Sequence, residues 1–102
     1  MNLEELLAKD AAVAVYFSGK ECGVCHVLQP KIKKLIQESF PRIAYHSLDA
    51  QEHSVLAASL GVLSVPTLLV FFEQKEFIRE VRNISIPLLK QKIQRPYTMI
   101  FL

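Results

Sequence analysis

The chain has 102 residues, a net charge of +2 and a composition that is 51% hydrophobic. These totals suggest a single domain with a packed core and argue against wholesale disorder. The basic residues are spread out, and the densest group, Lys31, Lys33 and Lys34, fits the polar side of a helix. We therefore expect no nucleic-acid partner. The N-terminus does not read as a secretory signal and no apolar run reaches the length of a membrane span, so we expect a cytoplasmic protein without membrane contact.

The N-terminal part of the chain predicts a short helix, a central strand and a long helix. Asn2 is a candidate cap for the first helix, which ends near Asp10. Residues 11–17 are apolar on both faces, as in a strand covered by helices on both sides. The second helix is predicted over residues 22–39. Because its apolar period resumes beyond Pro30, we expect that proline to kink the helix rather than end it.

A second strand and a third helix are predicted next. Residues 43–48 are less apolar than the first strand, which places them nearer an edge of the sheet. Asp49 and Glu52 have the spacing of a capping box, which predicts a helix shortly after this strand. Gly61 is a suitable C-terminal stop for that helix. The alternation of strand, helix and strand predicts parallel strands joined by right-handed crossovers.

The last part of the chain predicts an antiparallel hairpin and a final helix. Residues 68–72 and 77–82 flank a polar turn, and the second run alternates apolar with charged residues. Ser85 is the expected cap of the last helix, and Pro96 is its expected end. Residues 97–102 then form an apolar, β-prone tail. It would add a strand to the sheet, contact a second copy of the chain, or stay disordered.

The only two cysteines lie in the stretch Cys22-Gly23-Val24-Cys25, where a strand gives way to a helix. Unpaired N–H groups and the helix dipole stabilise a thiolate at a helix N-terminus, so Cys22 is the expected attacking group. Cys25 lies about one turn later and can resolve a mixed disulfide by attacking Cys22. The motif therefore predicts a catalytic dithiol–disulfide couple.

Two other uses of the motif stay open on the sequence alone. A zinc site needs about four ligands, and His26, His46 and His53 are available but show no ligand spacing. The run from Cys22 to His26 also matches the c-type haem attachment pattern, which belongs to exported chains. We expect neither a metal nor a bound cofactor, because the dithiol can itself be the redox centre.

Taken together, these features resemble the thioredoxin family over about residues 3–95. The residues that carry the resemblance are 13–17, the two cysteines with the residues between them, Pro30, Asp49 and 65–69. The resemblance implies an α/β thioredoxin fold. Its mixed sheet would have four strands, or five with the tail, flanked by helices on both faces, and would lack the family's N-terminal strand. It divides the chain into a thioredoxin-like domain, residues 1–96, and the apolar tail, residues 97–102.

The resemblance also implies a function. It predicts an enzyme that reduces or exchanges protein disulfides and is recharged by a reductase, as a monomer or as a weak homodimer through the tail. It implies a cis proline at Pro66, beside the dithiol. The implied substrate-docking residues are Gly23, Val24, Val65, Pro66 and Thr67.

Several residues depart from the family's pattern. Tyr16 stands where the family usually has a buried aspartate that assists proton transfer from the second cysteine. Ser18 and Glu21 stand where tryptophans are common, and Val24 stands where classical thioredoxins have proline. Asn83 occupies a position that is commonly glycine. These departures keep a second interpretation open: a redox-sensing or protein-interaction module with little turnover.

Overall fold

A computed structural model describes residues 2–102, which form a mixed four-stranded sheet in the order β2-β1-β3-β4. β1 (Ala12–Ser18) is parallel to β2 (Ala44–Asp49) and antiparallel to β3 (Thr67–Phe72). β3 pairs antiparallel with β4 (Lys75–Val81). The predicted parallel crossover, the late hairpin and the four strands are therefore confirmed.

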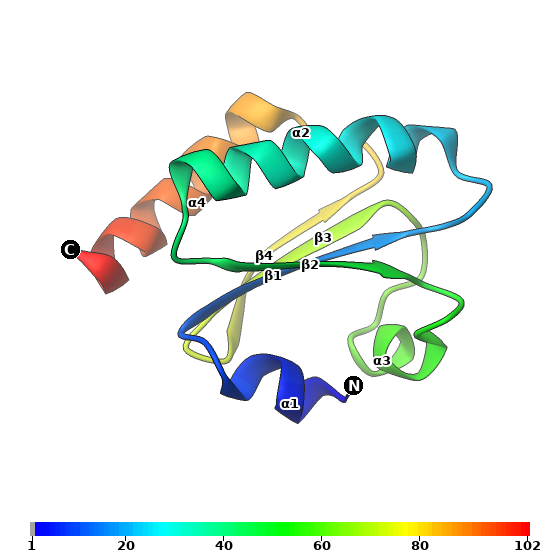
Figure 1. Ribbon diagram of the computed structural model, residues 1–102, viewed down its shortest axis with the longest axis horizontal. Coiled ribbons are helices and arrows are strands. Elements are labelled where there is room, and N and C mark those ends of the chain that lie inside the picture. The colour runs from blue at the N-terminus through cyan, green and yellow to red at the C-terminus, as the bar shows by residue number, and fades with distance from the viewer. Residues whose placement is uncertain (1) are drawn as a thin grey trace.

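Helices cover both faces of this sheet (Figure 1). α2 (Gly23–Ser39) and α4 (Ile86–Phe101) lie on one face, and α1 (Leu3–Ala8) and α3 (Ser54–Ser59) lie on the other. β1 and β3 are therefore buried on both sides, which explains why their sequences are continuously apolar. No helix within residues 2–102 is long and apolar enough to cross a membrane.

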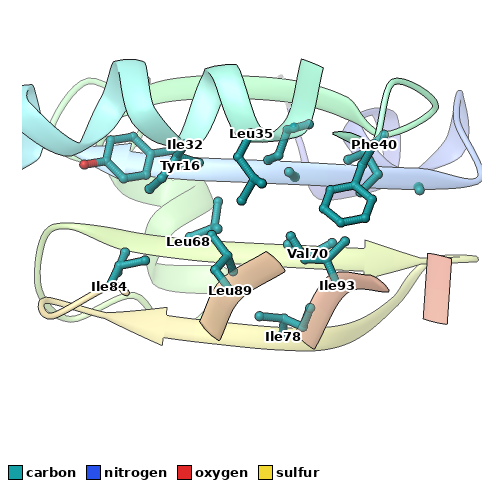
Figure 2. Packing of buried hydrophobic residues seen from close by; sticks show 14 of the residues in the cluster. Tyr16, Ile32, Leu35, Phe40, Leu68, Val70, Ile78, Ile84, Leu89 and Ile93 are labelled. Atoms are coloured by element: carbon teal, nitrogen blue, oxygen red, sulfur yellow. The ribbon is translucent and has the colours of Figure 1, made fainter. Parts of the chain in front are cut away.

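The core has two layers, one on each face of the sheet. Figure 2 shows the layer beneath α2 and α4, where Ile32 and Leu35 of α2 and Leu89 and Ile93 of α4 face the strands. Tyr16 lies at one end of this layer, and its hydroxyl points away from the other labelled side chains. The second layer joins α1 and α3 to the opposite face. Residues of β1 alternate between the two layers, as the period of a strand requires.

Three predicted helix ends are confirmed. The side chain of Asn2 accepts a hydrogen bond from the backbone N–H of Glu5 at 2.8 Å, and Ser85 accepts one from Leu88 at 3.4 Å. Gly61 follows α3 with a φ of +69°, a conformation that glycine adopts without steric cost.

The predicted capping box after β2 is wrong. Oδ1 of Asp49 accepts hydrogen bonds from the N–H groups of Gln51 and Glu52, at 2.9 and 3.1 Å. Those residues form a turn, and α3 begins only at Ser54, with His53 as its cap residue. The hydrogen bond from Glu52 is the main reason that the pKa of the Asp49 carboxyl lies below its usual value.

The predicted helix end at Pro96 is also wrong, and with it the β-prone tail. α4 continues to Phe101, although a proline removes one helical hydrogen bond. The ring of Tyr97 lies 5.0 Å from that of Phe40, and its hydroxyl accepts a hydrogen bond from the N–H of Arg42 at 3.2 Å. The Arg42 guanidinium in turn lies 4.5 Å from the centre of the Phe101 ring. These contacts hold the last turns of α4 against the chain that enters β2.

Candidate functional site

The two cysteines lie where the chain passes from β1 into α2. Figure 1 shows this connection at one end of the sheet. Cys22 is the cap residue of α2, and Cys25 lies in its first turn. The two residues form a disulfide, with their Cα atoms 5.3 Å apart. Sγ of Cys22 also accepts a hydrogen bond from the backbone N–H of Cys25 at 3.2 Å. The free N–H groups of the helix start therefore favour negative charge on Cys22.

The two sulfur-bearing residues differ in exposure. Cys22 is half-buried, whereas Cys25 is fully buried. Gly23 and Val24, which separate them, are exposed, and 58% of Val24 is accessible to solvent. An incoming disulfide therefore reaches Cys22 before it can reach Cys25.

The segment that precedes β3 lies beside Cys22. The Val65–Pro66 peptide bond is cis. Gly19 separates the Val65 side chain from Cys22, because a Cβ on that glycine would lie 3.4 Å from Cγ2 of Val65 and 3.8 Å from Cβ of Cys22. Both distances are ordinary van der Waals contacts, so Gly19 packs between the two segments and a methyl group would fit there.

Thr67 does not offer its side chain to the site. It is 1% exposed, and its hydroxyl donates to the carbonyl of Ser64 at 2.7 Å. Of the predicted docking residues, Pro66 and Thr67 are both buried, so their side chains shape the loop rather than its accessible surface.

An open apolar groove of about 740 Å³ runs alongside the motif. It is lined by Gly23, Val24, Val27, Leu28, Arg82, Asn83, Ile84 and Ser85. Val27, Leu28 and Arg82 were not predicted to be part of this surface. Val27 carried a usable signal, because it lies three residues after Val24 and so on the same side of the helix. Arg82 carried none, because its place depends on where β4 ends against β3.

Tyr16 lies against the resolving end of the motif. Its hydroxyl donates a hydrogen bond to the carbonyl oxygen of Cys25 at 2.8 Å, and the residue is completely buried. Burial, and secondarily the neighbouring Tyr45, raise the pKa of Tyr16 to about 12. The phenol is therefore neutral and a donor near pH 7, so it does not replace a carboxylate as a proton acceptor.

One charged group near the motif, Lys20, is paired elsewhere. Lys20 forms an ion pair with Glu52 at 3.4 Å, so it is not free to offset the negative charge of Glu21 beside Cys22. A ring nitrogen of His26 lies 3.1 Å from the carbonyl of Lys20 and joins the first turn of α2 to the preceding loop. Within residues 2–102, no three His, Cys, Asp or Glu side chains gather as a metal site would require.

A sequence model of the family described as Thioredoxin matches residues 1–95. The chain belongs to the thioredoxin family. Thioredoxin-like protein YdfQ of Bacillus subtilis is 29% identical over 99 residues, which cover 97% of this chain and 88% of that protein. Thioredoxin-1 of Saccharomyces cerevisiae is 33% identical over 80 residues, 78% of this chain and 77% of the relative. A solved mutant thioredoxin from Halobacterium salinarum superimposes with a TM-score of 0.81 at 28% identity, covering 94% of this chain and 82% of that one.

Thioredoxin-family membership and the cysteine pair together identify the chemistry. The protein is a thiol-disulfide oxidoreductase whose redox couple is Cys22 and Cys25. The predicted fold class and function are both confirmed.

Proposed function

We propose that the protein reduces or exchanges disulfides in other proteins, with Cys22 as the attacking cysteine and Cys25 as the resolving one. The difference in exposure carries this assignment: Cys22 is half-buried at the start of α2, and Cys25 is fully buried behind it. The thiolate is the reactive form, and the helix start favours it at Cys22. The dithiol is the redox centre, and no bound cofactor takes part.

The reaction proceeds in two exchanges. The Cys22 thiolate attacks one sulfur of the substrate disulfide, so a mixed disulfide forms and one substrate thiolate leaves. Cys25, as its thiolate, then attacks Sγ of Cys22, which releases the second substrate thiolate and forms the Cys22–Cys25 disulfide. Two electrons pass from the dithiol to the substrate. A reductase returns two electrons to the disulfide and restores both thiols.

The docking surface combines the exposed turn of α2 with the segment before β3. Gly23 and Val24 offer little side-chain obstruction and an apolar contact, and the half-buried Val65 lies near Cys22. Pro66 follows Val65 through the cis peptide bond and is itself buried. An extended substrate segment would pair with backbone groups at Val65, as added strands do in other complexes. Thr67 contributes through its fixed backbone.

The proposed partners are therefore protein disulfides and a recycling reductase. The inward contacts of Tyr97 and Phe101 support a monomer, and sedimentation at several protein concentrations would test it. A reducing compartment such as the cytoplasm is proposed because the chain keeps its only two cysteines for the redox couple. Cell fractionation would test that location.

Serine substitutions test the two roles separately. Cys22→Ser should lower protein-disulfide reduction more than about 100-fold, because no nucleophile then attacks. Cys25→Ser should accumulate a mixed disulfide between Cys22 and the substrate, visible as a mass adduct that excess dithiol releases. Thr98→Ser, on the exposed side of α4, should behave as wild type. Undiminished reduction by Cys22→Ser would overturn the assignment.

A redox-sensing or interaction module is the second candidate, and Tyr16 favours it. Its neutral hydroxyl bonds to the Cys25 carbonyl, so the buried group beside the resolving cysteine accepts no proton near pH 7. A sensor would exchange disulfides slowly while keeping an ordinary reduction potential. Turnover with insulin, compared with the potential of the couple against glutathione, distinguishes the two. Rapid turnover would remove the sensor.

A further inference from the structure

Arg82 occupies an unusual place at the groove beside the disulfide. It follows β4 directly, and its backbone N–H donates to the carbonyl of Pro66 at 2.8 Å. Its φ is +64°, a left-handed conformation that is uncommon for residues other than glycine. Asn83, where the sequence led us to expect a position that is commonly glycine, does not have positive φ, so the glycine-like conformation of this loop lies at Arg82. A long cationic side chain is thus attached to a backbone position that is fixed next to the proposed docking segment.

The charge on Arg82 has no partner within the described part of the chain. The ion pairs among residues 2–102 join Lys20 with Glu52, Arg79 with Glu76, and Lys92 with Glu80. Arg82 is in none of them, and it is exposed. Its guanidinium is therefore available to a ligand.

Arg82 also separates two hollows of the surface. It lines the groove that contains Val24 and Val27, and it lines a smaller cavity of about 430 Å³ that reaches Leu63. Neither lining includes an Asp or Glu side chain. The other cation, Arg79, is neutralised by Glu76 at 2.7 Å. Among the residues that line these two hollows, Arg82 is therefore the one charged side chain without an ion-pair partner. The other lining residues, apart from the paired Arg79, are uncharged.

We propose that Arg82 makes this oxidoreductase select disulfides whose cysteine is flanked by an acidic side chain. The inference rests on the proposed function and deepens it. An extended substrate segment would place its reacting cysteine at Cys22 and run past Val65 and Pro66. The next one or two substrate residues would then lie about 3 to 7 Å from that cysteine along the segment. A carboxylate there meets the guanidinium, which binds carboxylates through two parallel hydrogen bonds. The partner is thus a protein disulfide with Asp or Glu within about two residues.

The size of the preference follows from the exposure of Arg82. A charge at the rim of a binding surface acts mainly on the encounter and is screened by salt. A preference of about three- to fivefold in kcat/KM is therefore expected at low ionic strength. It should shrink toward one in about 0.5 M salt, where the screening length falls to a few ångströms.

The test uses two peptide disulfides that are identical except for Asp or Asn beside the cysteine. Wild type should prefer the Asp peptide, Arg82→Gln should reduce both equally, and Arg82→Glu should prefer a third peptide with Lys at that place. Arg95→Gln removes the same charge from an exposed site on α4 outside the groove, and it should keep the wild-type preference. A preference for the Asp peptide that survives Arg82→Gln would overturn the inference.

Two further outcomes separate this inference from the function on which it rests. Wild type that reduces both peptides at the same rate contradicts the role of Arg82 and leaves the oxidoreductase intact. Wild type that reduces neither peptide, nor the small neutral disulfide of 2-mercaptoethanol, contradicts the proposed function itself. Arg82→Gly is a second variant that removes the charge without straining the backbone, because glycine adopts a φ of +64° freely. It too should lose the preference, and retention of the preference would count against the inference.

Discussion

The hydroxyl of Tyr16 donates to the carbonyl of Cys25 at 2.8 Å, inside a fully buried site. With a pKa of about 12, it stays protonated through the physiological range. The proton of Cys25 must therefore leave to an acceptor other than this phenol. Tyr16 holds the first turn of α2 in place but does not share in proton transfer.

Tyr16→Phe tests that separation. It should lower the free energy of unfolding by about 1 kcal/mol, because one buried hydrogen bond is lost and the ring is retained. It should change kcat for disulfide reduction less than twofold. Urea unfolding and an insulin-type assay measure the two quantities. A tenfold fall in kcat at neutral pH would instead mean that the phenol takes part in the resolving step.

Tyr45→Phe is the matched control. The Tyr45 hydroxyl is buried and has no hydrogen-bond partner among the described residues. Ser47 is close enough to moderate the pKa of Tyr45, but not in hydrogen-bond geometry. Removing an unsatisfied hydroxyl should leave stability unchanged or slightly raise it.

The residues that perform the chemistry could be predicted from the sequence, whereas several residues that shape the surrounding surface could not. Two thiols at a fixed spacing before a helical pattern are a local signal, so Cys22 and Cys25 needed no tertiary information. Thr67 was expected at the accessible surface, but its hydroxyl is bonded to Ser64. Arg82 joins the site only because the pairing of Thr67 with Val81 sets the end of β4 beside Pro66. Such register is not encoded locally.

At the scale of elements, α4 shows how tertiary contacts outweigh a local helix breaker. The sequence predicted a kink at Pro30, where the apolar period resumes, and an end at Pro96. The period resumes beyond Pro96 as well, because Tyr97 and Phe101 follow Ile93 at helical spacing and pack against the same core. Applying one criterion to both prolines would have predicted the whole helix.

Tyr97→Ala should therefore loosen the end of α4. The variant loses the edge-to-face contact with Phe40 and the hydrogen bond to Arg42, and we expect about 2 kcal/mol lower stability in urea unfolding. Amide exchange should accelerate after Pro96 and stay slow near Ile93. Met99→Ala, at a side chain that is 76% exposed, is the control and should change stability by less than about 0.5 kcal/mol. Unchanged exchange in the Tyr97 variant would show that the contacts do not hold this turn.

At the scale of the whole molecule, the layered architecture could be predicted because the first strand is apolar on both faces. A strand apolar on both faces requires two covering layers, and the helical patterns before and after it supply them. The same enclosure buries Tyr16 and the hydroxyl of the partly buried Tyr45 on one face of the sheet. Burial raises the pKa of each to about 12, from an ordinary value near 10. These two side chains therefore make the free energy of unfolding depend on pH in the alkaline range.

The sign of this effect is fixed by proton binding. Between about pH 10 and 12 the unfolded chain releases the phenolic protons while the folded chain keeps them, so the free energy of unfolding falls as pH rises. Below pH 10 the two tyrosines add no pH dependence. Each can contribute a slope of up to about 1.4 kcal/mol per pH unit. Urea midpoints of the oxidised protein at several pH values between 8 and 11.5 measure it.

The double variant Tyr16→Phe with Tyr45→Phe isolates the two phenols from every other group that titrates at high pH. Lysines deprotonate in the same range, but wild type and variant share all of them. The variant should start slightly less stable at pH 8 and lose stability more slowly above pH 10, so the two curves converge. Phenolate absorbance of folded wild type should also develop later than that of the unfolded chain. Parallel stability curves would mean that both tyrosines ionise as freely in the folded protein as in the unfolded one.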